Sequence, residues 1–143
     1  MLIQRTVEAT AAPAAVFAYL SDFTTTTEWD PGTVTTERVS GDGGVGTEYV
    51  NVSEFNGKRS ELRYEVVELV PERRFALHGE GKGATADDVM EFEPTEGGGT
   101  RVTYTADIRL KGVLRLAEPF LGGAFKKLGD EAEAGMREAL ARL

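Results

Sequence analysis

Apolar and polar residues change their spacing twice along this chain. Over residues 2–9 they alternate, which predicts a strand. Helical spacing follows in PAAVFAYLSDF, residues 13–23, where the leading proline suits the first turn of a helix. A second short helical segment is expected over residues 22–28, with Asp22 as its cap, before the WDPG run at 29–32 forces a turn. The N-terminal region is therefore expected to form a strand and two short helices.

From residue 33 the spacing changes to a period of two, and turn residues rather than helices separate the apolar runs. Asn-Gly suits a two-residue type I′ turn, because both central positions need positive φ. The last run alternates between apolar and polar residues, so one of its faces is apolar. The pattern predicts an antiparallel meander with strands over 33–40, 46–54, 58–70 and 73–80, two later strands, and turns at Gly41–Gly44, Asn56–Gly57, Pro71–Glu72, Lys82–Gly83 and Gly97–Gly99.

After Gly112 the period returns to about 3.6. An apolar stripe then extends for nearly 30 residues, from Leu114 to Leu143. Proline removes an intrahelical hydrogen bond and glycine lowers helix propensity, so Pro119 and the following glycines predict a kink or break near residues 118–123. A continuous helix is expected over residues 124–142.

Composition and charge narrow the class of protein. A length of 143 residues, with 41% hydrophobic and 28% charged residues, is typical of one globular domain spanning residues 1–143. A net charge of -8 repels phosphate backbones and anionic headgroups, so we expect no nucleic acid partner. Cysteine is absent, which excludes disulfides and thiolate chemistry. No signal peptide or spanning segment is recognisable, so we expect a cytoplasmic protein with no membrane insertion; a homodimer remains open.

Six motifs in this order resemble the START-like (SRPBCC) superfamily, which includes the birch-pollen allergen relatives and the polyketide cyclase/dehydrase group. The resemblance implies an α+β helix-grip fold, in which a seven-stranded antiparallel sheet wraps around the C-terminal helix. Two short helices follow the first strand, and a cavity lies between sheet and helix. The motifs are APAAVFAYLSDF at 12–23, WDPG at 29–32, GGVGTEY at 43–49, YEVVELVPERRF at 64–75, FEPTEGGGTRVTY at 92–104 and the C-terminal helix.

No catalytic or metal-binding signature stands out. His78 is the only histidine, and its alternation with Phe75 and Leu77 predicts that it faces away from the core. The neighbouring carboxylates Asp87 and Asp88 point to opposite faces. We therefore expect no metal site and no cofactor.

Asp88 is the most informative polar residue. Its phase with Met90 and Phe92 aims the carboxylate inward, unless the side chain reaches water near the hairpin end of its strand. A carboxylate in an apolar cavity has a raised pKa or a hydrogen-bonding partner, which suits acid–base chemistry or the binding of a polar ligand group. Arg5 also has inward phase; it pairs with Asp88 or a ligand if buried, and fraying near the terminus is the simpler account.

The remaining candidates are apolar or aromatic side chains of inward phase. Tyr64 and Tyr104 are either polar anchors of a pocket or core residues. Trp29 is expected to act as a structural plug beside the Pro31 turn, with lining of the cavity mouth as the alternative. Tyr49 competes with Val50 and Val52 for the inward face. The predicted ligand-binding residues are Phe17, Leu62, Tyr64, Phe75, Leu77, Asp88, Met90, Tyr104, Leu121, Phe125 and Leu128.

The function favoured by these features is binding or carriage of a small hydrophobic molecule, such as a lipid, isoprenoid or polyketide. One alternative is a polyketide cyclase or dehydratase that uses the same cavity. Another is a protein-interaction module of the same fold, which would need an exposed apolar patch. Fold alone does not decide between them.

Overall fold

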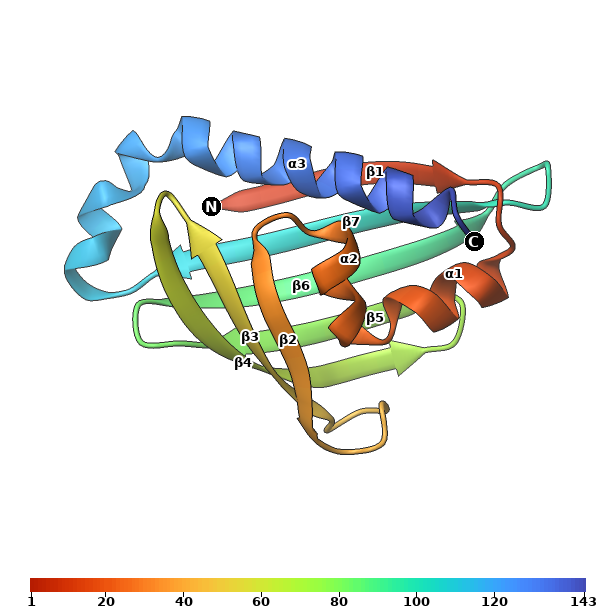
Figure 1. Ribbon diagram of the computed structural model, residues 1–143, viewed down its shortest axis with the longest axis horizontal. Coiled ribbons are helices and arrows are strands. Elements are labelled where there is room, and N and C mark those ends of the chain that lie inside the picture. The colour runs from red at the N-terminus through yellow and green to blue at the C-terminus, as the bar shows by residue number, and fades with distance from the viewer.

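A computed structural model describes residues 1–143 and shows an α+β fold built on one antiparallel sheet (Figure 1). The seven strands run in the order β1-β7-β6-β5-β4-β3-β2, so consecutive strands pair as hairpins and β1 closes against the last strand. The helix-grip prediction is confirmed. The strands are β1 (Leu2–Ala9), β2 (Thr33–Ser40), β3 (Glu48–Phe55), β4 (Lys58–Val70), β5 (Arg74–Glu80), β6 (Ala84–Pro94) and β7 (Thr100–Leu110).

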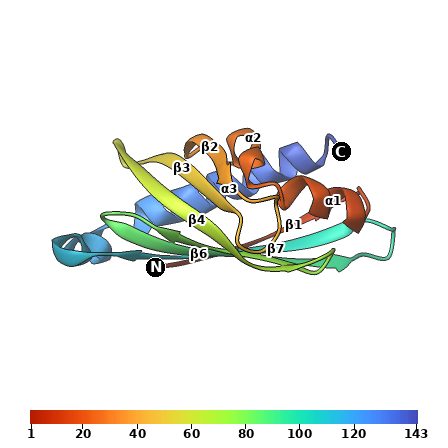
Figure 2. The same cartoon turned by 90° about the horizontal axis from the view of Figure 1, so that it is seen from below.

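The helices lie on one face of this curved sheet (Figure 2). Two short ones follow β1, and Asp22 caps the turn before the second by accepting a hydrogen bond from the Thr24 amide, as predicted. The long α3 runs beside β1 along the sheet (Figure 1). The helical segments are α1 (Pro13–Leu20), the 3₁₀ turn η1 (Phe23–Thr25), α2 (Thr26–Trp29), the 3₁₀-helix η2 (Gly112–Phe120) and α3 (Gly122–Leu140).

The predicted break before the last helix is present. The chain after β7 forms η2, which contains Pro119, and the α-helix begins only at Gly122. The upstream part of the apolar stripe does not pack as expected, because η2 contains no buried residue. A 3₁₀-helix repeats every three residues, so a stripe spaced for 3.6 residues per turn does not stay on one side of it.

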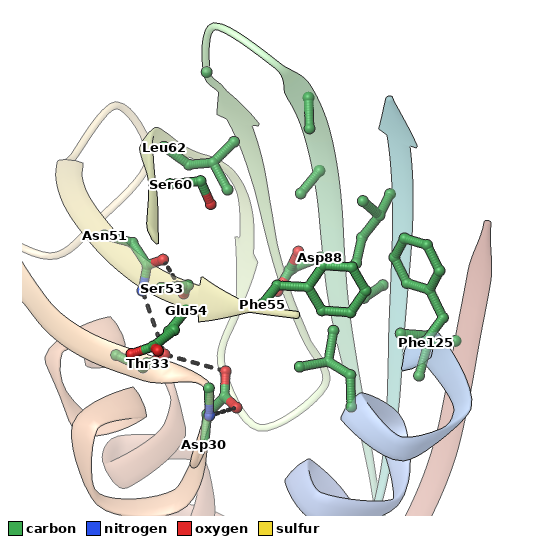
Figure 3. Close-up of a pocket in the computed structure, with 18 of the residues that line it drawn as sticks. Asp30, Thr33, Asn51, Ser53, Glu54, Phe55, Ser60, Leu62, Asp88 and Phe125 are labelled. Carbon is green, nitrogen blue, oxygen red and sulfur yellow. Dashed lines mark hydrogen bonds between the residues drawn. The ribbon is translucent and has the colours of Figure 1, made fainter. Parts of the chain in front are cut away.

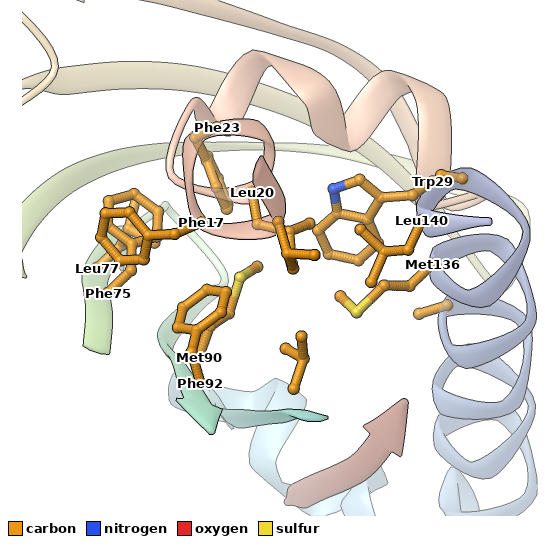
Figure 4. Packing of buried hydrophobic residues seen from close by; sticks show 14 of the residues in the cluster. Phe17, Leu20, Phe23, Trp29, Phe75, Leu77, Met90, Phe92, Met136 and Leu140 are labelled. Atoms are coloured by element: carbon orange, nitrogen blue, oxygen red, sulfur yellow. The ribbon is translucent and has the colours of Figure 1, made fainter. Parts of the chain in front are cut away.

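The main hydrophobic core packs between the sheet, the two short helices and the C-terminal half of α3 (Figure 4). Phe75 and Leu77 on β5 are 0% and 1% exposed, whereas the adjacent His78 faces outward, as the alternation predicts. Tyr49 takes the inward face of β3 and is 1% exposed, while Val50 is only half-buried. The core is closed by Met136 and Leu140 from the C-terminal half of α3.

Two glycines let α3 lie close to its neighbours, Gly135 against the backbone of α2 and Gly129 against side chains of β1. A Cβ atom on Gly135 would lie 1.9 Å from the carbonyl oxygen of Trp29 in α2. A Cβ on Gly129 would lie 2.7 Å from Ile3 and 2.8 Å from the guanidinium of Arg5, both on β1. These close contacts fix the position of α3 over the sheet.

Arg5 joins β1 to α3 rather than fraying or pairing with Asp88. Its guanidinium lies 2.9 Å from a carboxylate oxygen of Asp130 and 3.4 Å from one of Glu133. The arginine therefore meets helix carboxylates one turn apart, because residues three positions apart share a helix face. It holds the helix against the edge strand and contributes no cation to the interior.

We predict that Gly135→Ala destabilises the protein by about 1–3 kcal/mol, because the added methyl group collides with the Trp29 carbonyl and forces α3 away from α2. Gly123→Ala is the matched control on the same helix. No atom lies within 4 Å of the position that its added methyl group would take, so helix propensity alone should stabilise that variant by up to about 1 kcal/mol. Urea unfolding of both variants measures the difference, and equal effects would contradict this account of the helix contact.

Candidate functional site

A cavity of about 700 Å³ lies between the inner face of the sheet and α3. Of its 35 lining residues 18 are hydrophobic, which is typical of a site for a mostly apolar small molecule. The cavity exists because the core residues fill only one end of the space under α3. At the other end the strands continue, but their inward side chains leave the space under α3 unfilled.

One wall of the cavity is apolar. Phe125 and Leu128 project from α3, and Ala106 and Ile108 face them from β7. Phe55, at the end of β3, packs on Phe125 with ring centroids 4.8 Å apart. This wall has no hydrogen-bonding side chain and favours a hydrocarbon or aromatic surface.

The opposite wall, on the β2 and β3 side, carries a polar network (Figure 3). Asp30 accepts hydrogen bonds from the Gly32 amide at 3.0 Å and the Thr33 hydroxyl at 3.1 Å. The Ser53 hydroxyl donates to the side-chain oxygen of Asn51 at 2.7 Å. Burial raises the pKa of Asp30 from its usual value, although its two hydrogen bonds oppose that shift.

Asp88 lies deep in the cavity on β6 and does not reach water at the strand end. It is 4% exposed and accepts a hydrogen bond of 2.8 Å from the Tyr104 hydroxyl. Burial raises its pKa from 3.8 to about 7; the Tyr104 bond lowers the pKa, and the negative charges of Asp30 and Asp87 raise it further. Near neutral pH this carboxyl group is therefore present in both its protonated and its ionised form.

Both inward tyrosines line the same cavity. Tyr104 packs its ring edge-on against Trp29 at 5.6 Å, and Tyr64 packs on Phe23 at 4.9 Å. Burial raises the pKa of both phenols well above the usual value, so they stay protonated and act as hydrogen-bond donors. Gly79 makes room for Tyr64, because a Cβ there would lie 2.8 Å from the Tyr64 ring.

Trp29 both seals the core and lines the cavity. Its side chain is 2% exposed, which agrees with the predicted structural role. Its Nε1 is the one buried side-chain polar atom without a hydrogen-bond partner. Such orphaned donors are costly, so the indole is held there by packing rather than by polar contacts.

The structure places seven of the eleven predicted ligand-binding residues on the cavity wall: Leu62, Tyr64, Asp88, Tyr104, Leu121, Phe125 and Leu128. The other four, Phe17, Phe75, Leu77 and Met90, lie in the filled core instead. Alternation along a strand shows which face a side chain takes, but not whether core or cavity covers that part of the strand. Phe17 of α1, for example, packs edge-on against Phe92 at 5.0 Å.

Sequence reasoning missed the polar wall. Asp30, Thr33, Asn51 and Ser53 come from a turn and from strands whose inward face was uncertain from the pattern. Once Tyr49 is known to point inward, alternation along β3 also turns Asn51 and Ser53 inward. In the sequence, Val50 and Val52 compete with Tyr49 for the inward face, so the direction of Asn51 and Ser53 could not be read from the alternation.

The mouth of the cavity is marked by lining residues that are also exposed to solvent. They come from the β3–β4 hairpin, the β5–β6 turn and η2, which lie together at one end of the molecule (Figure 1). Lys111 links two of these segments, since its amide donates to the Gly83 carbonyl at 2.9 Å. The exposed lining residues include Asn56, Lys58, Arg59, Lys82 and Leu114.

The single histidine lies on the outer face of the sheet. His78 contacts Asp87 through Nδ1 at 2.6 Å and Glu80 through Nε2 at 2.9 Å. These two hydrogen bonds raise its pKa. No group of three or more His, Cys, Asp or Glu side chains is placed to hold a metal ion. None of the helices combines the length and the apolar character needed to cross a membrane.

The chain matches, over residues 2–143, the sequence profile of the family described as polyketide cyclase / dehydrase and lipid transport. Because the match covers nearly the whole chain, the protein belongs to this family. A search of curated proteins finds none that matches.

Solved structures share the fold at low sequence identity. A protein of Thermus thermophilus is 21% identical, with a TM-score of 0.81 over 98% of this chain and 97% of its own. The ZhuI aromatase/cyclase of Streptomyces sp. R1128 is 13% identical, with a TM-score of 0.82 over 98% and 93%. A START superfamily protein of Mycobacterium smegmatis is 14% identical, with a TM-score of 0.74 over 96% and 98%. These similarities establish the START-like, helix-grip architecture.

The raised pKa of Asp88 predicts a pH-dependent stability. Because the folded state holds this proton up to about pH 7 whereas the unfolded chain releases it near 3.8, stability falls as pH rises between these values. Between about pH 5 and about pH 8 the free energy of unfolding of the wild type should fall by roughly 2–3 kcal/mol relative to that of Asp88→Asn, whose side chain cannot ionise. Urea unfolding of both proteins at each pH checks this, and parallel curves would show that Asp88 ionises normally in the fold.

Proposed function

We propose that this protein binds and carries a small, mostly hydrophobic molecule that has at least one polar group. The observation that carries the proposal is a cavity of about 700 Å³ whose apolar wall is formed by α3 and β7 and whose depth holds the Asp88–Tyr104 pair. Membership of a family that includes lipid transport supports it. We expect the hydrocarbon part of the ligand to lie against Phe125 and Ile108.

The polar group of the ligand would meet Asp88, Tyr104 and Tyr64. Asp88 with a pKa of about 7 accepts a hydrogen bond when ionised and donates one when protonated. Tyr64 has no side-chain acceptor in the structure and remains available as a donor. A hydroxyl or carbonyl group fits this site better than a carboxylate, because no cation faces Asp88 to offset a second buried negative charge.

Apolar burial is large enough to give useful affinity. Burying about 500 Å² of ligand hydrocarbon would contribute roughly 12 kcal/mol, and one or two hydrogen bonds would add about 1 kcal/mol each. An association cost of about 5 kcal/mol would leave about 8 kcal/mol, which corresponds to micromolar binding.

The test combines native mass spectrometry of the freshly purified protein with titration of the neutral apolar fluorophore N-phenyl-1-naphthylamine. We expect a co-purifying apolar mass or micromolar uptake of the fluorophore. Ala106→Leu extends into the cavity and should weaken uptake by about tenfold, because it removes volume between β7 and α3. Ala134→Leu, on the exposed face of α3, is the control and should bind as the wild type does. No uptake by folded wild type would reject the carrier function.

A second candidate is catalysis of a cyclisation or dehydration within the same cavity. The observation that favours it is the buried carboxyl group with a pKa near neutrality beside a phenol, since a group that both takes and gives protons at working pH suits general acid–base catalysis. In this role Asp88 would remove a proton next to a carbonyl group, and Tyr104 or Tyr64 would donate a hydrogen bond to the oxygen that gains charge. The cavity walls would hold the flexible substrate in the bent conformation that cyclisation requires.

Asp88→Asn separates the two candidates. It keeps the shape and hydrogen-bonding capacity of the side chain but removes the proton-transfer group, so a carrier should keep its affinity within about threefold. A cyclase should lose turnover of a linear poly-β-carbonyl thioester by at least about 100-fold. Product formation followed by liquid chromatography and mass spectrometry measures this loss. Absence of turnover in the wild type would rule out this reaction.

A further inference from the structure

The segment η2 presents an unusual concentration of exposed apolar side chains. Val113 is 82% exposed, Leu116 is 77% exposed and Phe120 is 87% exposed. No residue of this nine-residue helix is buried. Soluble surfaces rarely gather large apolar groups in this way unless they meet a partner or a membrane.

This apolar tip, defined as residues 113–120, is continuous with the mouth of the cavity. Leu114 and Ala117 line the cavity from η2, while Leu116 and Phe120 do not. Leu114 also touches the β5–β6 turn, since a Cβ on Gly83 would lie 2.9 Å from its Cδ1 atom. The same short helix therefore has one side toward the cavity and another toward solvent, at the far end of the molecule (Figures 1 and 2).

Charge is distributed unevenly over the protein, and the surroundings of the apolar tip carry no excess of negative charge. Residues 54–61, 80–83 and 111–120, which surround the mouth, carry five basic and four acidic residues, although the whole chain has a net charge of -8. Nearby ion pairs occupy Arg63 and Lys111. The cations without such a partner at this end are Lys58, Arg59, Lys82 and Arg115.

We propose that this end of the molecule docks on the surface of a phospholipid bilayer, with Val113, Leu116 and Phe120 inserted at the boundary between headgroups and acyl chains. The unpaired cations then lie at the level of the lipid phosphates, and the excess negative charge of the protein points away from the membrane. This orientation opens the cavity toward the lipid, from which an apolar ligand is loaded or into which it is released. That last step rests on the proposed carrier function; the docking itself does not.

Vesicle flotation of the full chain tests the proposal, using phosphatidylcholine vesicles with and without phosphatidylglycerol. The wild type should float with both and bind more strongly to the anionic vesicles, and salt should weaken only that additional binding. Leu116→Ser with Phe120→Ser should lower vesicle binding by at least about tenfold. Both side chains are exposed and outside the cavity, so thermal unfolding and N-phenyl-1-naphthylamine uptake in solution should not change.

Two matched controls isolate the site. Val39→Ser with Val45→Ser removes apolar side chains that are 44% and 65% exposed elsewhere, and it should leave vesicle binding unchanged. Lys58→Gln with Arg59→Gln should weaken binding to anionic vesicles by about threefold or more. Arg38→Gln with Arg73→Gln changes the net charge by the same amount as the Lys58/Arg59 variant, but it should leave binding to anionic vesicles unchanged.

The outcomes are distinct from those of the carrier test. Fluorophore uptake without flotation overturns the docking proposal. The exposed apolar side chains of the tip would then be assigned to contact with a protein partner. Flotation without uptake supports docking and rejects the carrier function. Equal loss of flotation in the tip variant and the Val39/Val45 variant also overturns the proposal, because it shows non-specific adsorption.

Discussion

The position of α3 over the sheet is the constraint on which the rest of the structure depends. Gly135 brings the helix against the α2 backbone, and Gly129 brings it against β1, where Arg5 bridges two helix carboxylates. With the helix held there, its C-terminal half closes the core through Met136 and Leu140. Its N-terminal half spans a part of the sheet that lacks enough side-chain volume to fill the gap, and the cavity follows.

The same arrangement explains the electrostatics of the cavity. A buried carboxylate normally needs a cation, and Arg5 is the inward cation of β1, but it is engaged by Asp130 and Glu133. Asp88 is left with the Tyr104 hydroxyl, so its pKa rises to about 7 instead of falling. Asp88 is therefore protonated in a large fraction of the molecules near neutral pH, which lowers the negative charge inside the cavity.

The two ends of the molecule differ because β7 is followed by a 3₁₀-helix that buries none of its residues. At one end α1 covers the sheet and the core is filled. At the other end η2 leaves its apolar side chains in solvent beside the cavity mouth. The filled core and the cavity are thus separated along the length of one sheet, and the apolar tip adds little to the buried core.

The sequence by itself determined the elements and their faces. Period-two alternation, Asn56-Gly57 and the break at Pro119 are local signals, because strand faces, tight turns and helix interruptions depend on neighbouring residues. They were enough to predict the strands, the turns, the last helix and the outward direction of His78. The helix-grip arrangement of these elements came from the family resemblance, and the phase of Asp88 left open whether its side chain reaches water. What only the tertiary structure decided is where the filled core stops. Phe17 and Met90 lie in that core and Phe125 lies on the cavity, although all three have the same inward signal. Burial depends on segments distant in sequence, so no local pattern separates a core position from a cavity wall.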